Sequence, residues 1–371
     1  MLRLLFFGII TSAMNKKATK KTVVVGLSGG VDSSVTAALL KKQGFDVIGV
    51  YMKNWSEDFG DFGCTWAEDS EDARKVATLL DIPFYVWNFE KEYKEKVVEY
   101  FLREYQAGRT PNPDVMCNSE IKFKVFLDKA LKLGAHFVAT GHYAQVKKVK
   151  GQFKLLKGVD PAKDQSYFLY TLKQEQLAKV LFPLGGMKKS HVRLLAKKFK
   201  LPNAEKKDSQ GICFIGKIDV REFLMANLKA RKGEIVSTTG EKVGQHVGLP
   251  YYTIGQRQGI GLGGQGPYYV VHKDLKKNRL IVTNDKDDKQ LWKQKFQVVD
   301  LSWTNTAPKL PLRTGVTIRY HHPDYPAKVE KVGRKLSVTF LDPQRAITSG
   351  QAAVFYRGNE LIGGGVIEMV M

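Results

Sequence analysis

Residues 23–34 bring glycine, serine and aspartate together in a pattern that can hold a phosphate group. The β-branched run 23–25 predicts a strand, Ser-Gly-Gly at 28–30 predicts a turn, and Asp-Ser-Ser at 32–34 opens an amphipathic helix. Backbone N–H groups in such a turn and the positive end of the helix dipole attract anions. The alternative is an ordinary strand–helix turn in which Asp32 only caps the helix. Two adjacent glycines framed by hydroxyl side chains favour phosphate binding.

This loop differs from two common phosphate-binding motifs. The P-loop requires a lysine directly after its last glycine, but Val31 follows Gly30 in this sequence. The spacing of Gly26, Gly29 and Gly30 also does not fit the dinucleotide fingerprint Gly-x-Gly-x-x-Gly. A third class of nucleotide loop is therefore expected.

The cysteines are the second group that could do chemistry. Cys117 ends a proline-punctuated loop, and a helix starting near Asn118 or Ser119 would stabilise its thiolate. Cys213 lies in a glycine-containing segment, although a lone cysteine is more often a small buried apolar residue. Cys64 has no partner in this scheme, and we expect it to be structural. Because the three are far apart and form no Cys-x-x-Cys pair, neither a zinc site nor a secreted disulfide framework is expected.

The charge of the chain predicts a polyanionic partner. The 371 residues include 59 Lys and Arg against 37 Asp and Glu, a net charge of +22. Such an excess favours RNA or DNA, although a solvated basic surface is the simpler alternative for any single lysine. No apolar run has membrane-spanning length. We interpret residues 1–20 as a disordered leader or an over-extended start, with Met14 as an alternative start, and expect a cytoplasmic protein; organelle targeting by this extension is the alternative.

The elements that position these residues alternate as in an α/β protein. Strands and helices follow one another through residue 140, which predicts a doubly wound parallel sheet with ligands at the carboxyl ends of its strands. The loop at 26–34, Met52, the segment 112–117 and Gly141–His142 all fall at such ends. The expected strands are Thr22–Leu27, Val47–Tyr51, Phe84–Phe89 and Phe137–Thr140, and the expected helices are Asp32–Lys42, Trp66–Leu80, Lys91–Ala107 and Ser119–Leu133.

The second half of the chain is expected to be mainly β. We expect helices at Gln165–Lys179 and Ser190–Phe199, a polar loop at Asn203–Gly211, and a small all-β module from Glu234 to Ile260. The segments Phe296–Trp303, Val316–Tyr320, Ala327–Val332, Lys335–Phe340, Gln351–Tyr356 and Leu361–Met369 predict a C-terminal β-barrel. The expected divisions are a leader at 1–20, a catalytic ATP-binding domain at 21–222, a central β-rich domain at 223–285 and a tRNA-contacting barrel at 286–371.

Several motifs together resemble one enzyme family. Ser-Gly-Gly-Val-Asp-Ser resembles the pyrophosphate loop (PP-loop) of the ATP pyrophosphatases, which split ATP to AMP and pyrophosphate. The segments 111–118, 139–143, 163–169, 208–215 and 255–262 resemble, in order, motifs of the tRNA-specific 2-thiouridylases. The resemblance runs from about Lys21 to the end of the sequence. The chain departs from the family in its N-terminal extension, which leaves targeting open.

The resemblance implies a substrate set, a reaction and a set of site residues. ATP, accompanied by Mg²⁺ and with no dedicated metal site, would activate the C2 oxygen of a wobble uridine as an adenylate. Cys213 would carry the sulfur as a persulfide, and Cys117 would either release hydrosulfide from it or assist the transfer directly, leaving a Cys117–Cys213 disulfide. Asp114 would act as acid or base, with an Asx-turn cap as the alternative. The nucleotide residues carried over are Gly26, Leu27, Ser28, Gly29, Gly30, Val31, Asp32, Ser33, Met52 and Gly141. The tRNA residues are Asn112, Pro113, Asp114, His142, Lys163, Asp164, Gln165, Arg319, Tyr320 and Gln344.

The resemblance also implies partners, and two other functions stay open. The partners would be tRNAs for Lys, Glu and Gln and a persulfide-carrying relay protein, with the enzyme itself a monomer. One alternative is another ATP pyrophosphatase, either a sulfurtransferase acting on a different nucleotide or an amidating ligase, although neither Cys117 nor Cys213 has the histidine arrangement of an amide-donor site. The other is an RNA-binding module with a decayed ATP loop, against which the intact loop and both cysteines argue.

Overall fold

The computed structural model describes residues 20–57, 65–208, 220–263 and 266–371. Residues 1–19, Cys64 and Cys213, for which the sequence suggested a leader, a structural thiol and a persulfide carrier, lie outside the described residues.

A parallel sheet forms the first part of the chain, as the sequence predicted. Its order is β3-β2-β1-β4-β7, and every neighbouring pair is parallel. The strands are β1 (Thr22–Gly26), β2 (Asp46–Lys53), β3 (Phe84–Asn88), β4 (Phe137–Ala139) and β7 (Val180–Leu181).

Helices cover both faces of this sheet because successive valines of β1 point to opposite sides. Val23 and Val25 pack with Ala37 and Ala73 of the helices on one face, whereas Val24 packs with Val98 and its neighbours on the other. The helical elements are α1 (Val31–Lys42), α2 (Trp66–Leu79), α3 (Glu90–Tyr93), the π-helical η1 (Lys94–Val98), α4 (Glu99–Gln106), α5 (Pro113–Met116), the π-helical η2 (Cys117–Phe126), α6 (Leu127–Lys132) and α8 (Lys189–Lys198). The doubly wound fold is thereby confirmed.

The helix expected at Gln165–Lys179 is wrong. The chain forms only the 3₁₀ turn η3 (Ser166–Leu169) and the single turn α7 (Gln174–Leu177). The carboxylate of Asp164 accepts hydrogen bonds from the backbone N–H and the hydroxyl of Ser166, at 3.1 and 3.0 Å. These local bonds compete with helix formation. Residues 166–170 are also all buried, which leaves no solvent face for an amphipathic helix.

The central part of the chain is a small β domain. Its sheet has the order β10-β11-β8-β9, with β8 and β11 parallel. The elements are α9 (Val220–Asn227), β8 (Gly233–Ser237), β9 (Lys242–His246), the 3₁₀ turn η4 (Leu249–Tyr251), β10 (Tyr269–Asp274) and β11 (Arg279–Thr283).

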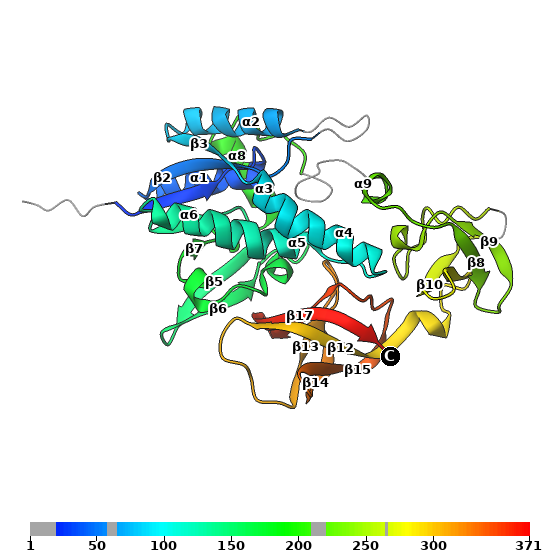
Figure 1. Ribbon diagram of the computed structural model, residues 1–371. Coiled ribbons are helices and arrows are strands. Elements are labelled where there is room, and N and C mark those ends of the chain that lie inside the picture. The colour runs from blue at the N-terminus through cyan, green and yellow to red at the C-terminus, as the bar shows by residue number, and fades with distance from the viewer. Residues whose placement is uncertain (1–19, 58–64, 209–219, 264–265) are drawn as a thin grey trace, which may run out of the picture.

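The C-terminal part is a closed antiparallel barrel, as expected. Its strands run β12-β15-β14-β13-β16-β17, and pairing of β12 with β17 closes it. After the turn η5 (Lys289–Leu291), they are β12 (Trp292–Trp303), β13 (Leu312–Thr317), β14 (Tyr325–Val332), β15 (Lys335–Arg345), β16 (Ala352–Arg357) and β17 (Glu360–Val370). In Figure 1 the barrel lies below the parallel sheet and the central domain lies to one side of both.

The barrel also pairs with a hairpin of the first domain, which the sequence analysis did not identify. The hairpin consists of β5 (Ala144–Val149) and β6 (Gln152–Lys157), and β6 pairs with β17 through Leu155 opposite Leu361. The ion pair between Lys154 and Glu360, at 2.8 Å, lies on the same seam. The first domain and the barrel thus share one continuous eight-stranded sheet.

Candidate functional site

The loop between β1 and α1 has the shape of an anion cradle. Gly29 has φ +76°, and a Cβ there would lie 2.3 Å from the carbonyl oxygen of Asp69, so only glycine fits. The Ser28 N–H donates to Ser33 Oγ at 3.1 Å, and the Ser33 hydroxyl donates to the Gly30 carbonyl at 3.0 Å. Gly30 is the N-cap of α1 and no side chain caps the helix, so the capping alternative for Asp32 is wrong.

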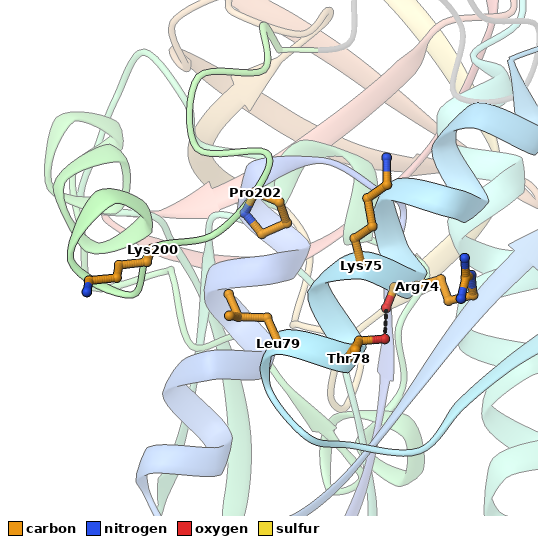
Figure 2. Close-up of a pocket in the computed structure, with 6 residues that line it drawn as sticks. All are labelled: Arg74, Lys75, Thr78, Leu79, Lys200 and Pro202. Carbon is orange, nitrogen blue, oxygen red and sulfur yellow. Dashed lines mark hydrogen bonds between the residues drawn. The ribbon is translucent and has the colours of Figure 1, made fainter.

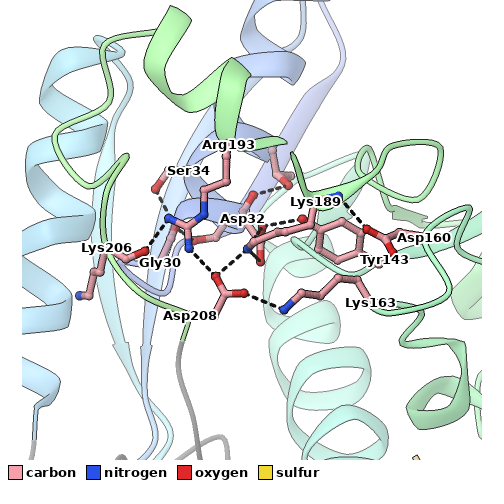
Figure 3. A network of polar contacts seen from close by, with 12 residues as sticks. Gly30, Asp32, Ser34, Tyr143, Asp160, Lys163, Lys189, Arg193, Lys206 and Asp208 are labelled. Atoms are coloured by element: carbon pink, nitrogen blue, oxygen red, sulfur yellow. Dashed lines mark hydrogen bonds and ion pairs between the residues drawn. The ribbon is translucent and has the colours of Figure 1, made fainter. Parts of the chain in front are cut away.

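Asp32 is instead held by a lysine and a tyrosine hydroxyl from other parts of the chain (Figure 3). Lys189 Nζ donates to both carboxylate oxygens at 2.8 Å, and the Tyr143 hydroxyl donates to Oδ1 at 2.8 Å. Burial and the nearby Asp32 charge raise the pKa of Tyr143 well above its usual range, so this hydroxyl keeps its proton. The Asp32 carboxylate is therefore held in place by Lys189 and Tyr143.

Asn203, to which the sequence analysis assigned no role, supports the loop through two hydrogen bonds. Its amide Nδ2 donates to the Gly29 carbonyl at 2.8 Å and to Ser34 Oγ at 2.9 Å. The side chain is buried, and within the described part of the chain its Oδ1 accepts no hydrogen bond. The Asn203 amide group thus holds both the loop backbone at Gly29 and the Ser34 side chain in the first turn of α1.

Asp208 extends this network of charges (Figure 3). Its carboxylate contacts Lys163 at 2.7 Å, Lys189 at 2.8 Å and Arg193 at 2.6 Å. Burial alone would raise the pKa of Asp208, but the hydrogen bonds from Lys163 and Lys189 lower it to about 2. Lys163, expected to contact tRNA, therefore lies close to the phosphate loop.

The other expected nucleotide residues converge on the same edge of the sheet. A Cβ on Gly26 would lie 3.1 Å from Met52 Cε, and a Cβ on Gly141 would lie 2.9 Å from the backbone of Asp32 and Ser33. These distances bring the ends of β1, β2 and β4 within contact of the loop. The structure thus gathers the ten expected nucleotide residues, 26–33, Met52 and Gly141, at one place.

Cys117 lies within a helical run and not at a helix N-terminus, so that expectation is wrong. The run begins at Pro113 and extends through α5, η2 and α6 to Lys132, with a kink at Phe123, where φ is −105° and ψ is 17°. Asn112 caps it by accepting the Val115 N–H at 3.2 Å, so the cap is Asn112 and not Asp114. The Cys117 side chain is 0% exposed. The thiol is therefore closed to solvent in this structure.

The segment 163–168 and the barrel lie against this loop. The Tyr320 ring packs on Phe168 with centroids 4.4 Å apart. Burial raises the pKa of Tyr320 to about 12, and the charges of Asp164 and Asp114 add to this effect. Arg319 donates to the Arg345 and Ala346 carbonyls at 2.7 and 2.9 Å. Three sequence-distant groups of expected tRNA residues are thereby brought together.

Gln165 connects this region with the phosphate loop. Its Oε1 accepts the Tyr143 N–H at 3.1 Å, and the Tyr143 hydroxyl in turn donates to Asp32. Asp164 is occupied by the chain itself, since it accepts the Gly158 N–H at 2.9 Å as well as the two bonds from Ser166. Burial raises its pKa.

Two of the expected tRNA residues are buried in this structure. His142 bonds Thr140 Oγ1 at 2.6 Å, and burial followed by the nearby Lys122 charge lowers its pKa well below the usual range, so the ring is neutral. Gln344 is also buried and donates to the Asp342 carbonyl at 3.0 Å.

A pocket of about 430 Å³ lies elsewhere on the first domain (Figure 2). None of the expected site residues lines it; its lining is Arg74, Lys75, Thr78, Leu79, Lys200 and Pro202. Among the described residues, no three His, Cys, Asp or Glu side chains are grouped to hold a metal ion. The same residues contain no helix long and apolar enough to cross a membrane.

The chain matches known families over almost its whole length. Residues 21–217 match the tRNA methyl transferase HUP domain, 221–284 the tRNA methyl transferase PRC-barrel domain, and 293–367 the aminomethyltransferase beta-barrel domain. Among solved structures, a 4-thiouridine synthetase–RNA complex with bound ATP superposes with a TM-score of 0.35 and 19% identity over 53% of this chain and 46% of that one. A similarity this weak says nothing about what this chain binds.

Curated relatives are much closer. The tRNA-specific 2-thiouridylase MnmA of Geobacillus thermodenitrificans is 51% identical, and that of Halalkalibacterium halodurans is 52% identical, each over 96% of this chain and 97% of the relative. The protein of the same name from Listeria monocytogenes serotype 4b is 54% identical over 94% of this chain and 95% of its own length. The chain belongs to the family of tRNA-specific 2-thiouridylases, as its motifs predicted.

Proposed function

We propose that this protein is a tRNA 2-thiouridylase, a sulfurtransferase that converts a wobble uridine of tRNA to 2-thiouridine with cleavage of ATP to AMP and pyrophosphate. The observation that carries the proposal is the phosphate cradle at Gly26–Ser33, held next to the helical run that contains Cys117, in a chain about half identical to named 2-thiouridylases. The segments 21–222, 223–285 and 286–371 act as catalytic, central and tRNA-contacting domains.

ATP is the co-substrate that the cradle fits. The glycine backbone at 29 and 30 leaves room for phosphate oxygens, and the side chains of Ser28 and Ser33 offer hydroxyl groups. Gly141 keeps the end of β4 close to the loop, and Met52 contributes an apolar contact for the adenosine. Mg²⁺ accompanies the phosphates and neutralises part of their charge. The cation Lys189 balances Asp32 at the edge of the same site.

The first chemical step joins the nucleotide to the base. The uridine C2 oxygen attacks the α-phosphate, forming an adenylated base, and pyrophosphate leaves. Asp114 lies at the start of the helical run beside Tyr320 and is the candidate for moving a proton at the base. The uridine is flipped out of its stack to reach this position.

The second step replaces AMP with sulfur. In one route, Cys117 attacks the Cys213 persulfide and releases hydrosulfide, which attacks C2 and expels AMP. In the other, the terminal persulfide sulfur attacks C2 and expels AMP, and Cys117 then attacks the Cys213 sulfur to free the 2-thiouridine. Both routes leave a Cys117–Cys213 disulfide, which a thiol reductant must reduce before the next turnover. The role of Cys213 rests on its sequence motif.

The RNA is bound by basic and aromatic groups from two domains. Lys163 and Arg319 supply cations and Tyr320 supplies a stacking surface, with Asn112, Gln165, His142 and Gln344 as further contacts. The substrates are tRNAs for Lys, Glu and Gln, the sulfur comes from a persulfide-carrying relay protein, and the enzyme acts as a monomer in the cytoplasm.

Mass spectrometry of tRNA nucleosides tests the proposal directly. Unmodified tRNA is incubated with the protein, ATP, Mg²⁺ and a persulfide source, using wild type, Cys117→Ser, Cys213→Ser and the control Cys64→Ser. We expect 2-thiouridine with wild type and Cys64→Ser, and a loss of at least about a thousandfold in the other two variants. ATP cleavage without any thiolated nucleoside would instead favour an amidating or other pyrophosphatase. Absence of tRNA-dependent pyrophosphate release would favour a binding module.

A further inference from the structure

The loop that leads to Cys117 is held by the barrel as well as by its own domain. The Thr110 N–H donates to the Ser349 carbonyl at 2.9 Å. From the barrel, Gln351 Nε2 donates to the Thr110 carbonyl at 2.9 Å and to the Pro111 carbonyl at 3.2 Å. Thr110 is only 7% exposed. Backbone groups on both sides of Thr110 therefore find their partners in the barrel turn 348–351.

The two backbones approach so closely that only glycine fits between them. Gly350 has φ +93°, and a Cβ there would lie 2.8 to 2.9 Å from three backbone atoms of Thr110. The turn itself is anchored to the barrel, since the Gly350 N–H donates to the Ile367 carbonyl of β17 at 2.7 Å. The backbone of the barrel turn therefore contacts the backbone of the loop directly, with no side chain between them at Gly350.

The same loop has two further anchors. Thr110 Oγ1 lies 3.2 Å from Thr253 Oγ1 of the central domain. Farther along the chain, Asn112 hydrogen-bonds with Tyr167, whose hydroxyl donates to the Ala352 carbonyl of β16 at 3.0 Å. Residues 110–112 are thus attached to the central domain, to the barrel turn 348–351 and, through Tyr167, to Ala352 at the start of β16.

We propose that the barrel turn 348–351, through Gln351, is a positioning device that fixes the loop carrying Asn112, Asp114 and Cys117 for the chemical step. The inference rests on the proposed function. It gives the barrel a part in forming the reaction site in addition to binding tRNA. Gln351 is a positioning residue, because it touches the loop and not the reacting atoms.

The test compares Gln351→Leu with a matched control in the same barrel. Gln294 Nε2 also donates to two backbone carbonyls, those of Phe340 and Leu341, each at 2.9 Å, but within the barrel itself. Gln294→Leu therefore removes two hydrogen bonds of the same kind at a position that does not contact the loop. Gln351→Glu is a second variant that keeps the shape of the side chain and removes its N–H donors.

The first measurement is amide hydrogen exchange of the full-length protein. Exchange in the segment 110–117 should become faster on the order of tenfold in Gln351→Leu and Gln351→Glu, since two hydrogen bonds to the loop are lost, and should not change in Gln294→Leu. Unchanged exchange in both Gln351 variants overturns the proposal. This measurement uses no tRNA, so its result is independent of whether the wild type forms 2-thiouridine.

The second measurement is steady-state thiolation. We expect kcat to fall roughly ten- to a hundredfold in both Gln351 variants, because misplaced reacting groups cost about this much, with KM for tRNA and the affinity for ATP within about twofold of wild type. A loss confined to KM, an unchanged kcat, or an equal loss in Gln294→Leu overturns the proposal. A wild type that forms no 2-thiouridine at all contradicts the proposed function, and the exchange experiment then still decides whether the turn positions the loop.

Discussion

Lys273 is a buried lysine of the central domain, and its burial affects the stability of the protein. It lies on β10, it is 8% exposed, and its Nζ donates to the Tyr252 carbonyl at 2.9 Å. Burial lowers its pKa from 10.5 to about 8. An ammonium group with a carbonyl as its partner thus lies inside the central domain, where its charge is costly.

This burial predicts a pH dependence of stability. The unfolded chain holds the Lys273 proton up to pH 10.5, whereas the folded chain releases it near pH 8. Between these values the unfolded state binds more protons, so the free energy of unfolding rises with pH. From pH 7 to 9.5 we expect a gain of about 2 kcal/mol, measured as a shift of the urea midpoint for the transition that includes the central domain. Lys273→Met should abolish this gain, and an identical gain in that variant would contradict the assignment.

At the residue scale, the sequence predicted the site only where its chemistry is local. The phosphate loop lies within a dozen consecutive residues, so their types alone predicted it. Asn203 reaches Gly29 from 174 positions away, and Gln351 reaches Thr110 from 241 positions away. An asparagine or a glutamine in a polar segment gives no local sign of such a contact, which depends on how the domains meet.

Among the elements, the turn between β1 and α1 depends most strongly on a single conformation. Its φ of +76° at Gly29 is in the left-handed region, and the space for a side chain is occupied by the backbone of α2. The parallel strands around it were predictable because fully buried strands form continuous apolar runs. The hairpin β5–β6 was not, because Lys147, Lys148 and Lys150 interrupt its apolar pattern and its partner β17 comes about 200 residues later.

Gly29→Ala tests the turn against a matched glycine. We expect ATP affinity to fall by at least about a hundredfold, because the loop must move to relieve both the strained φ and the clash with Asp69. The control Gly44→Ala has a similar φ of +88° but no atom within 4 Å of the new Cβ. That variant should lose about 1 kcal/mol of stability and keep its ATP affinity. Equal ATP affinities in the two variants would show that the shape of the Gly29 turn does not matter for nucleotide binding.

At the scale of the whole molecule, charge is the feature that composition alone revealed. The net charge of +22 remains after every Asp and Glu is balanced against a Lys or Arg, so ion pairs within the chain cannot neutralise it. Composition could predict a polyanionic partner but not where it binds. The contact between Tyr320 of the barrel and Phe168 of the first domain could be seen only in the fold.

The affinity for unmodified tRNA should therefore depend steeply on salt. If about six phosphates are neutralised, affinity falls roughly a thousandfold between 50 and 200 mM KCl, because bound cations are released from the RNA. A titration at several KCl concentrations gives the slope. An uncharged osmolyte at matched osmolality is the control and should leave affinity nearly unchanged. A flat salt dependence would mean that the excess charge serves some purpose other than RNA binding.

The pairing of β6 with β17 also bears on how the chain is made. Leu155 is synthesised about 200 residues before Leu361, the strand partner it faces in the finished protein. On the ribosome, the first domain can therefore form its parallel sheet while one edge of the hairpin still exposes unpaired N–H and C=O groups. Lys154 and Lys157 lie on β6, the strand that forms this unpaired edge, and such charges discourage pairing with another nascent chain. The lysines of β6 would thus protect the hairpin from aggregation until β17 has been synthesised.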